Sequence, residues 1–211
     1  KIKFVHNMTE FWENAFNNRQ EMWGMTPTKS AEFATDFFKK NGIKNILIPG
    51  IGYGRNAKPF LDNGIHVSGI EISKTAIELA QKHYGERLDI FNGSVTQMPF
   101  NDKKYEGIFC HALIHLLDDQ KRKKLIQNCY DQLIENGYMI FTAVTKQAPE
   151  YGKGELLGKD RYEVYKGAAI FYYDKESVKK EFEAYGLLEV IEVTENQPMY
   201  LIKCKKKLKN D

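Results

Sequence analysis

Residues 45–60 of the chain read NILIPGIGYGRNAKPF. An apolar run at 46–48 stops at a proline, glycines alternate at Gly50, Gly52 and Gly54, and a polar, helix-like stretch follows. This order predicts a strand, a tight glycine turn and a helix, an arrangement that lets the backbone lie directly against a nucleotide-like ligand.

Apolar segments of strand length alternate with amphipathic segments of helical length along the rest of the chain. We expect strands at 44–48, 66–71, 88–92, 105–110, 138–144, 187–193 and 199–204. We expect helices at 55–63, 74–84, 119–135 and 175–185, with Gly137 and Gly186 as left-handed residues after the last two. The alternation predicts an α/β fold with a doubly wound, mostly parallel, seven-stranded Rossmann-like sheet. Because only residues 195–198 separate the last two strands, one strand is expected to run antiparallel at the sheet edge.

Two segments lie outside this alternation. Residues 8–40 precede the first strand and are expected to form two helices around the sequence WGMTP at 23–27. Residues 145–173 are rich in glycine and tyrosine and follow the fifth strand. We expect residues 1–40 to form an N-terminal helical cap or lid, residues 41–211 to form the main domain, and residues 145–173 to be an insertion in it.

Composition argues against several classes of protein. The net charge of +3 gives no reason to expect a nucleic-acid partner. Cys110, Cys129 and Cys204 are widely spaced and lack a CxxC pair, which favours free thiols in a reducing cytoplasm over disulfides or a zinc site. No apolar run approaches the roughly 20 residues that a membrane-spanning helix needs, and no signal peptide is apparent.

The glycine spacing and one acidic residue narrow the choice of ligand. A dinucleotide-binding loop, G-x-G-x-x-G/A, would place a small residue at position 55, where this chain has Arg55. Glu71 ends the second strand, 21 residues after Gly50, where a carboxylate can accept hydrogen bonds from a ribose diol. The alternative for these two features is a tight turn without ligand and a strand-end carboxylate in water.

The next two strands also end in polar residues. Ser94 follows the third strand and could reach an adenine edge, with Val95 packed on the ring. Cys110 and His111 end the fourth strand. Four successive strand ends therefore converge on one crevice, as ligand sites in open α/β sheets do.

Taken together, the loop, Glu71, the segment GSVTQMPF at 93–100 and the antiparallel final strand resemble a class I S-adenosylmethionine-dependent methyltransferase over residues 40–204. The resemblance implies that the glycine loop lies under the methionine part of S-adenosylmethionine, that Glu71 binds the ribose and that Ser94 and Val95 contact the adenine. It implies that Cys110 and His111 lie near the sulfonium. The cofactor-binding set that we expect is Gly50, Gly52, Gly54, Arg55, Asn56, Glu71, Ile72, Ser94, Val95, Cys110, His111 and Trp23.

The chain departs from the family pattern at two positions. An acid usually stands two residues before the first glycine, where this chain has Ile48, and Asp is common at the position of Ser94. The N-terminal residues FWE at 11–13 and MWGMTP at 22–27 resemble the thiopurine and thiol/halide methyltransferase branch, in which a tryptophan-containing segment folds over the cofactor. The alternative for Trp12 and Trp23 is ordinary helix packing.

The acceptor side offers two histidines. A neutral hydroxyl or amine acceptor can require a base, whereas a thiolate or halide does not. His111 is the candidate base, His115 is more typical of a core residue, and no ligand set for a metal accompanies the pair. The segment 145–173 is expected to lie on the acceptor side.

These patterns lead to one function and two rivals. We expect methyl transfer from S-adenosylmethionine to a small-molecule nucleophile, with S-adenosylhomocysteine as product, by a cytoplasmic monomer or homodimer without nucleic-acid or membrane partners. A non-catalytic nucleoside-binding regulatory protein on the same fold is the alternative. An NAD-dependent oxidoreductase is disfavoured by Arg55.

Overall fold

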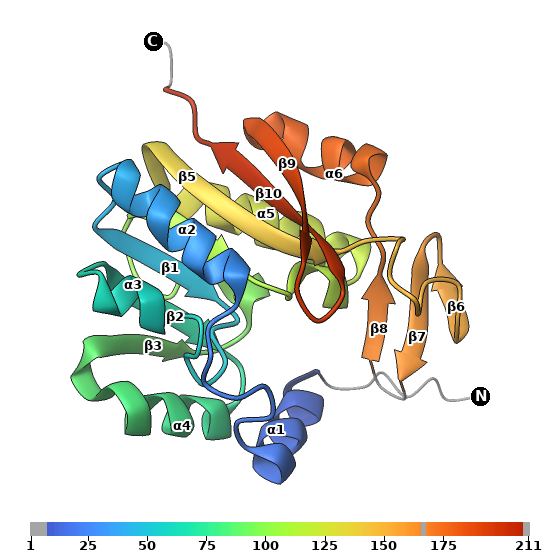
Figure 1. The fold of residues 1–211 in the computed structure, drawn as a ribbon, viewed down its shortest axis with the longest axis horizontal. Coiled ribbons are helices and arrows are strands. Elements are labelled where there is room, and N and C mark those ends of the chain that lie inside the picture. Colours follow the sequence, from blue (N-terminus) through green and yellow to red (C-terminus); the bar gives the residue numbers. More distant parts are fainter. Residues whose placement is uncertain (1–7, 166–167, 209–211) are drawn as a thin grey trace.

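The computed structural model describes residues 8–165 and 168–208, so residues 1–7 of the expected cap lie outside it. A seven-stranded sheet in the order β3-β2-β1-β4-β5-β10-β9 forms its centre (Figure 1). The strands are β1 (Asn45–Pro49), β2 (His66–Glu71), β3 (Leu88–Asn92), β4 (Tyr105–Cys110), β5 (Leu133–Val144), β9 (Leu187–Thr194) and β10 (Pro198–Lys205). The first five pair in parallel, whereas β10 runs antiparallel to both β5 and β9, one position in from the edge. The expected mostly parallel sheet is confirmed.

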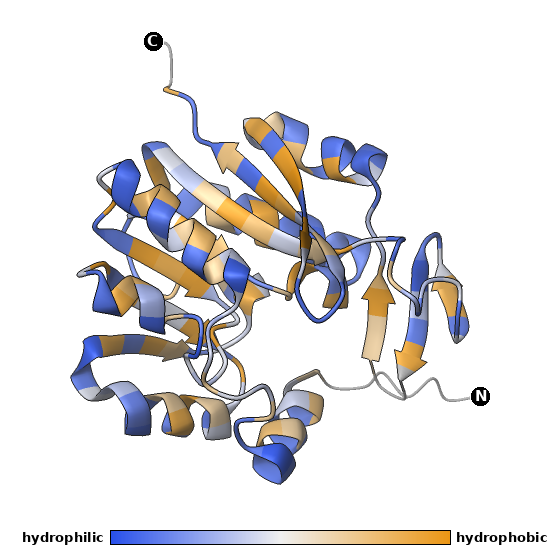
Figure 2. Cartoon of the chain, viewed as in Figure 1, coloured by the Kyte–Doolittle hydropathy of each residue, from blue (hydrophilic) through white to orange (hydrophobic). Residues whose placement is uncertain are grey.

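Helices cover both faces of this sheet because neighbouring strand residues point in opposite directions. Ile46 and Ile48 pack with Phe38 of α2 (Lys29–Lys40) and Phe60 of α3 (Lys58–Asp62), and α4 (Lys74–Tyr84) joins this layer. Leu47 belongs to the opposite layer, with α5 (Asp119–Gln132) and α6 (Lys175–Phe182). Figure 2 shows the central strands as mainly hydrophobic, whereas the helices alternate between hydrophobic and hydrophilic residues.

Three of the expected helices have different bounds in the structure; the one expected at 175–185 ends as an α-helix at Phe182, and a 3₁₀ turn covers 183–185. The helix expected at 119–135 ends at Gln132, and β5 already begins at Leu133, because Leu133 pairs with Tyr105 of β4 and this pairing overrides the helical pattern. Asn136 takes the positive φ of 61°, and Gly137 does not, so the expected left-handed Gly137 was wrong. The left-handed Gly186 is confirmed, at φ 75°. The helix expected at 55–63 is shorter, since only 58–62 are helical.

The segment 145–173 forms a second, three-stranded sheet that the sequence patterns did not predict. Its antiparallel order is β6 (Glu155–Gly158), β7 (Arg161–Tyr165) and β8 (Ala168–Phe171), and it stands apart from the main sheet in Figure 1. Ion pairs of the Lys146 ammonium hold together the segments before and after this small sheet. The ammonium lies 2.9 Å from Asp160 and 2.5 Å from Asp174.

The N-terminal segment has two parts with different surroundings. The buried face of α2 packs on the main sheet, whereas α1 (Met8–Arg19) lies beside α4, beyond the carboxyl ends of β1 and β2 (Figure 1). The carboxylate of Glu13 accepts hydrogen bonds from the Ser73 and Thr75 hydroxyls, at 2.7 and 2.6 Å, and so fastens α1 to the first turn of α4. Phe16 is buried against Tyr53 of the glycine loop. The part of the segment that covers the strand ends is therefore α1 and the loop that leads to α2.

Candidate functional site

A cavity of about 370 Å³ opens at the carboxyl ends of β1, β2 and β4. The turn after β3 also lines it. Ten of the twelve residues that we expected to bind the cofactor line it, namely Trp23, Gly50, Gly52, Arg55, Asn56, Glu71, Ile72, Ser94, Val95 and His111. Gly54 and Cys110 are not among the lining residues. The structure therefore brings most of the sequence-derived set into one place.

The glycine loop is held close to β2 by its own backbone. The amides of Gly50 and Ile51 both donate to the Ile70 carbonyl, at 2.8 and 3.1 Å. Gly50 has φ +69°, and a Cβ there would lie 2.9 Å from Leu113 Cδ2, so a side chain is excluded by conformation and by space. Gly54 serves packing instead, because a Cβ at that position would lie 2.8 Å from the Tyr84 ring.

Glu71 joins the loop to the end of β2. One carboxylate oxygen accepts the Gly52 amide at 2.8 Å, and the other accepts the amides of Ile72 and Ser73, both at 2.9 Å. Burial raises the pKa of Glu71, and these three hydrogen bonds partly offset that rise. A carboxylate offers about four acceptor sites, so one remains for a hydroxyl donor in the cavity.

The turn after β3 supplies a polar and an apolar residue. The Ser94 hydroxyl accepts the Thr96 amide at 3.3 Å and lies 2.9 Å from the Thr96 hydroxyl, so it starts the short turn that follows. Val95 is buried in that turn and lines the cavity. This wall can face a flat, apolar ring, with the Ser94 hydroxyl at its edge.

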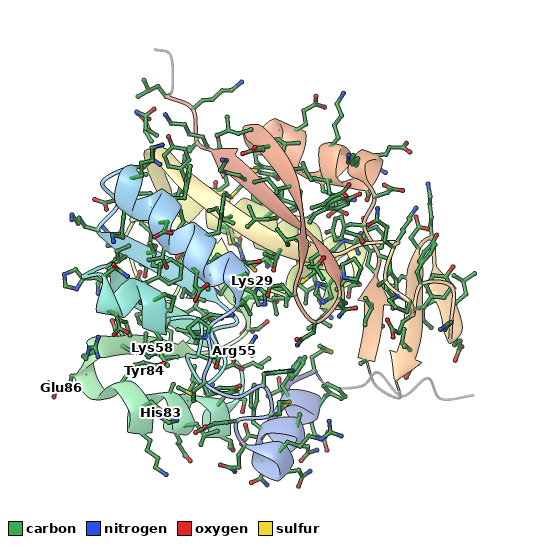
Figure 3. The ribbon with its side chains drawn as sticks, in the orientation of Figure 1. Lys29, Arg55, Lys58, His83, Tyr84 and Glu86 are labelled. Carbon is green, nitrogen blue, oxygen red and sulfur yellow. The ribbon has the colours of Figure 1, made fainter. Side chains whose placement is uncertain are left out.

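Tyr53 and Arg55 of the loop hold the N-terminal segment over the cavity. The Tyr53 hydroxyl donates to the Gly24 carbonyl at 2.8 Å and accepts the Trp23 amide at 3.1 Å. Arg55, labelled in Figure 3, donates from Nη1 to the Trp23 carbonyl at 2.8 Å. The Trp23 ring stacks on Tyr53 with an interplanar angle of 15° and remains 44% exposed. Sequence reasoning missed Tyr53, although its place between two glycines of the loop is the signal that could have found it.

Asn56 fixes the start of α2. Its side-chain oxygen accepts both the amide and the hydroxyl of Thr28, at 3.0 and 3.2 Å. Thr28 in turn caps α2, because its hydroxyl accepts the Ala31 amide. Arg55 and Asn56 line the cavity, but the hydrogen bonds described here connect them to the N-terminal segment.

Two histidines stand at the end of the cavity beyond β4. His111 Nδ1 lies 2.8 Å from the Thr142 hydroxyl of β5, and His115 Nδ1 accepts the Val144 amide at 3.4 Å. Burial lowers the pKa of His111 to about 4 and that of His115 to about 3, so both rings are neutral at pH 7. The surrounding wall is mostly apolar and includes Met8, Trp12, Leu113, Leu116, Leu117 and Met199.

The turn between β9 and β10 completes this end of the cavity. Residues 195–197 line it, and one carboxylate oxygen of Glu195 accepts the Ser30 amide and hydroxyl, at 2.7 and 2.5 Å. These residues lie at least 84 positions after His111 in the sequence. No local sequence motif marks them. Only the antiparallel pairing of β10 with β5 brings them to the site.

Cys110 lies elsewhere. Its side chain is fully buried in the core with Leu125 and Cys129, and this burial raises the pKa of the thiol. All three cysteines are buried and unpaired, as the sequence led us to expect.

Among residues 8–165 and 168–208, no group of three or more histidine, cysteine, aspartate or glutamate side chains is placed to hold a metal ion. Within the same residues, every helix is too short or too polar to cross a membrane.

Comparison with known proteins agrees with this geometry. Residues 47–141 match a family model described as a methyltransferase domain. An uncharacterised methyltransferase of Geobacillus sp. (strain WCH70) is 26% identical over 142 residues, which are 67% of this chain and 60% of that protein. The carboxy-S-adenosyl-L-methionine synthase of Wolinella succinogenes is 28% identical over 63% of this chain and 55% of its own length. The chain thus spans little more than half the length of these two relatives.

Two solved structures share the fold at low sequence identity. The 1,6-didemethyltoxoflavin-N1-methyltransferase of Burkholderia thailandensis, bound to S-adenosylhomocysteine, superposes with a TM-score of 0.74 at 13% identity, over 95% of this chain and 87% of its own. Magnesium protoporphyrin IX methyltransferase of Synechocystis, bound to S-adenosylmethionine, gives 0.70 at 12% identity, over 97% and 100%. The match over residues 47–141 and the shared fold support a class I methyltransferase domain, in agreement with the sequence resemblance. The resemblance to the thiopurine and thiol/halide branch stays a prediction.

Proposed function

We propose that this protein transfers the methyl group of S-adenosylmethionine to a small-molecule nucleophile by in-line displacement. The observation that carries the proposal is the convergence of Glu71, the glycine loop and the Ser94–Val95 turn on one cavity. In the proposed arrangement, Glu71 faces the ribose, the Ser94–Val95 turn faces the adenine, and the glycine loop faces the methionine chain of S-adenosylmethionine. The cofactor supplies the reactive methyl group, and the protein binds, orients and excludes water.

In this proposal, Glu71 accepts one ribose hydroxyl with its remaining acceptor site. Val95 packs on the adenine, and the Ser94 hydroxyl meets its edge. Gly50 and Gly52 leave room for the methionine end, where Ile48 gives an apolar wall in place of the acid that the family usually has.

The N-terminal segment would serve as the lid. Trp12, Phe16, Trp23 and Tyr53 form a continuous set of ring contacts over the cavity, with centroid separations of 5.9 to 6.3 Å. A closed, weakly polar pocket favours methyl transfer, because the positive charge on sulfur disperses as the reaction proceeds. The acceptor would enter at the histidine end, and a cavity of about 370 Å³ suits a small molecule.

Titration calorimetry with S-adenosylmethionine, S-adenosylhomocysteine and NAD tests the cofactor. We expect binding of the two sulfur nucleosides and none of NAD; absence of heat with both sulfur nucleosides would refute the proposal. Transfer of radiolabelled methyl groups to a panel of carboxylic acids, phenols, thiols, halides and amines then tests catalysis. Binding without transfer to any member would instead favour a regulatory nucleoside-binding protein.

A further inference from the structure

The hydrogen bonds of the two histidines determine where each neutral ring carries its proton. The Val144 backbone amide donates to His115 Nδ1 at 3.4 Å. Because a backbone N–H can only donate, Nδ1 of His115 holds a lone pair, and the ring proton is on Nε2.

Thr142 settles the same question for His111. Its hydroxyl is fully buried and accepts the Ala112 amide at 2.9 Å, so this contact uses a lone pair of the oxygen. Within the described part of the chain, the only other hydrogen-bond partner of the hydroxyl is His111 Nδ1, at 2.8 Å. A buried hydroxyl proton needs an acceptor, so Thr142 donates to Nδ1 and the His111 proton is also on Nε2.

The charged groups around the pair leave both rings neutral. Glu195 raises the pKa of His111 and Arg55 lowers it, but burial dominates, and His111 lowers the pKa of His115 further. Glu71 stands at the cofactor end, and Lys121 lines the cavity with its ammonium 3.1 Å from Asp118. With Nδ1 occupied by a donor and Nε2 already protonated, neither ring has a free lone pair with which to remove a proton.

We propose that His111 and His115 act as paired N–H donors that bind an anionic oxygen of the methyl acceptor, a carboxylate or the ionised hydroxyl of an acidic phenol or enol, carried on an apolar body. This inference rests on the proposed function and names its substrate class. The apolar walls formed by Leu113, Leu116 and Met199 suit the body of such a molecule.

The chemistry needs no base. The oxyanion attacks the methyl carbon of S-adenosylmethionine, a C–O bond forms, and the C–S bond breaks with its electron pair left on sulfur. The products are a methyl ester or ether and neutral S-adenosylhomocysteine, and no proton is transferred. The expected role of His111 as a general base stays a prediction that this arrangement does not favour.

The tautomers can be measured without any substrate. Long-range ¹⁵N–¹H correlation spectra of the ¹⁵N-labelled protein separate protonated from unprotonated ring nitrogens, and His111→Gln and His115→Gln variants assign the signals. We expect both rings to be neutral at pH 7 with the proton on Nε2. A proton on Nδ1 of His111 would overturn the proposal, whether or not the protein binds a cofactor.

Substrate preference is tested with matched anionic and neutral probes. In the presence of saturating S-adenosylhomocysteine, calorimetry compares benzoate with benzamide and 4-nitrophenolate with 4-nitroanisole. We expect tighter binding of the anion in at least one pair, and equal or tighter binding of the neutral partner in both pairs contradicts the proposal. Binding of S-adenosylhomocysteine is measured first, so a failure of the cofactor assignment is seen separately.

Two substitutions of His111 separate a donor from a base. Glutamine keeps an N–H donor but cannot act as a base, whereas leucine removes both functions. For the best acceptor in the panel, we expect His111→Leu to lower kcat/KM by about 10- to 100-fold, as for a lost hydrogen bond to a charged group, and His111→Gln by less than about 10-fold. An equal loss in both variants, with a pH profile that follows a single basic group in the enzyme, would support the base instead.

Discussion

The two ends of the cavity are built in different ways. At the cofactor end, the amides of the glycine loop meet Ile70 and Glu71 within 21 residues of chain, and main-chain groups provide most of the contacts. At the other end, which we propose binds the acceptor, the segment after β4, the end of β5, the β9–β10 turn and α1 come together. The first end is a local motif, and the second exists only when distant segments have been packed together.

The two ends are therefore sensitive to different changes in sequence and pH. Backbone hydrogen bonds at the cofactor end depend on few side chains, of which Glu71 is the most connected. The proposed acceptor end depends on two neutral histidines, of which His115 is buried and His111 is half-buried, so its stability is tied to pH. The N-terminal segment spans both ends, and Tyr53 and Asn56 fasten it.

Acidification should affect the acceptor end most. The folded-state pKa values of His111 and His115, about 4 and about 3, lie below the ordinary value of 6.5. Folding therefore favours the neutral rings. The stability that depends on keeping them neutral is fully present above pH 6.5 and is lost as the pH falls toward 4. We expect a loss on the order of 3–6 kcal/mol in the free energy of unfolding between pH 7 and pH 4, measured by urea unfolding.

The matched control is the double variant His111→Gln/His115→Gln. The raised pKa of buried Glu71 acts in the opposite direction and is common to both proteins, so the difference between their pH profiles reports the histidines. Parallel profiles for the two proteins would show that the histidines are not buried in neutral form.

Glu71→Ala tests the cofactor end. The substitution removes the proposed ribose acceptor and leaves three backbone amides without their partner. We expect S-adenosylhomocysteine affinity to fall by about 1–3 kcal/mol, measured by calorimetry. Glu13→Ala removes a carboxylate that accepts hydrogen bonds from Ser73 and Thr75 at the start of α4 and serves as the control, with a smaller loss. Unchanged affinity in Glu71→Ala would refute its assignment.

Asn56→Ala tests the link between the glycine loop and α2. It removes the oxygen that accepts two hydrogen bonds from Thr28 in a buried place. We expect the free energy of unfolding to fall by about 1–2 kcal/mol, measured by thermal or urea unfolding. Asn56→Asp keeps that oxygen and should retain more of the stability; an equal loss in both variants would contradict the interpretation.

Tyr53→Phe tests the lid with the smallest change. It deletes the hydroxyl that contacts Trp23 and Gly24, and we expect cofactor affinity to fall by about 1 kcal/mol, with a changed Trp23 fluorescence. Tyr84→Phe is the control, because the buried Tyr84 hydroxyl has no hydrogen-bond partner among the described residues; Figure 3 labels it on α4. Equal effects of the two variants would show that the hydroxyl contacts do not hold the segment.

Sequence patterns predicted the fold well where local rules apply. The bounds expected for β2, β3, β4 and α4 agree with the structure, since apolar runs and caps fix them locally. The patterns failed where pairing with another strand decided the outcome, as at Leu133, and where the chain leaves the repeat, as in β6–β8. Ten of the expected residues line the cavity, whereas Gly54 and Cys110 do not, and Cys110 lies in the core because the end of a strand has two faces.

Local sequence patterns suffice to predict the class of domain and the cofactor end of the cavity, because a glycine loop and a strand-end acid act through neighbouring backbone groups. The proposed acceptor end forms only when segments far apart in the sequence pack together. No sequence motif marks Thr142, Val144 or Glu195. The sheet brings them into hydrogen-bonding contact with His111, His115 and Ser30, respectively. Hydrogen bonds between distant segments fix the proton on each ring, and that choice depends on partners that no local pattern can reveal.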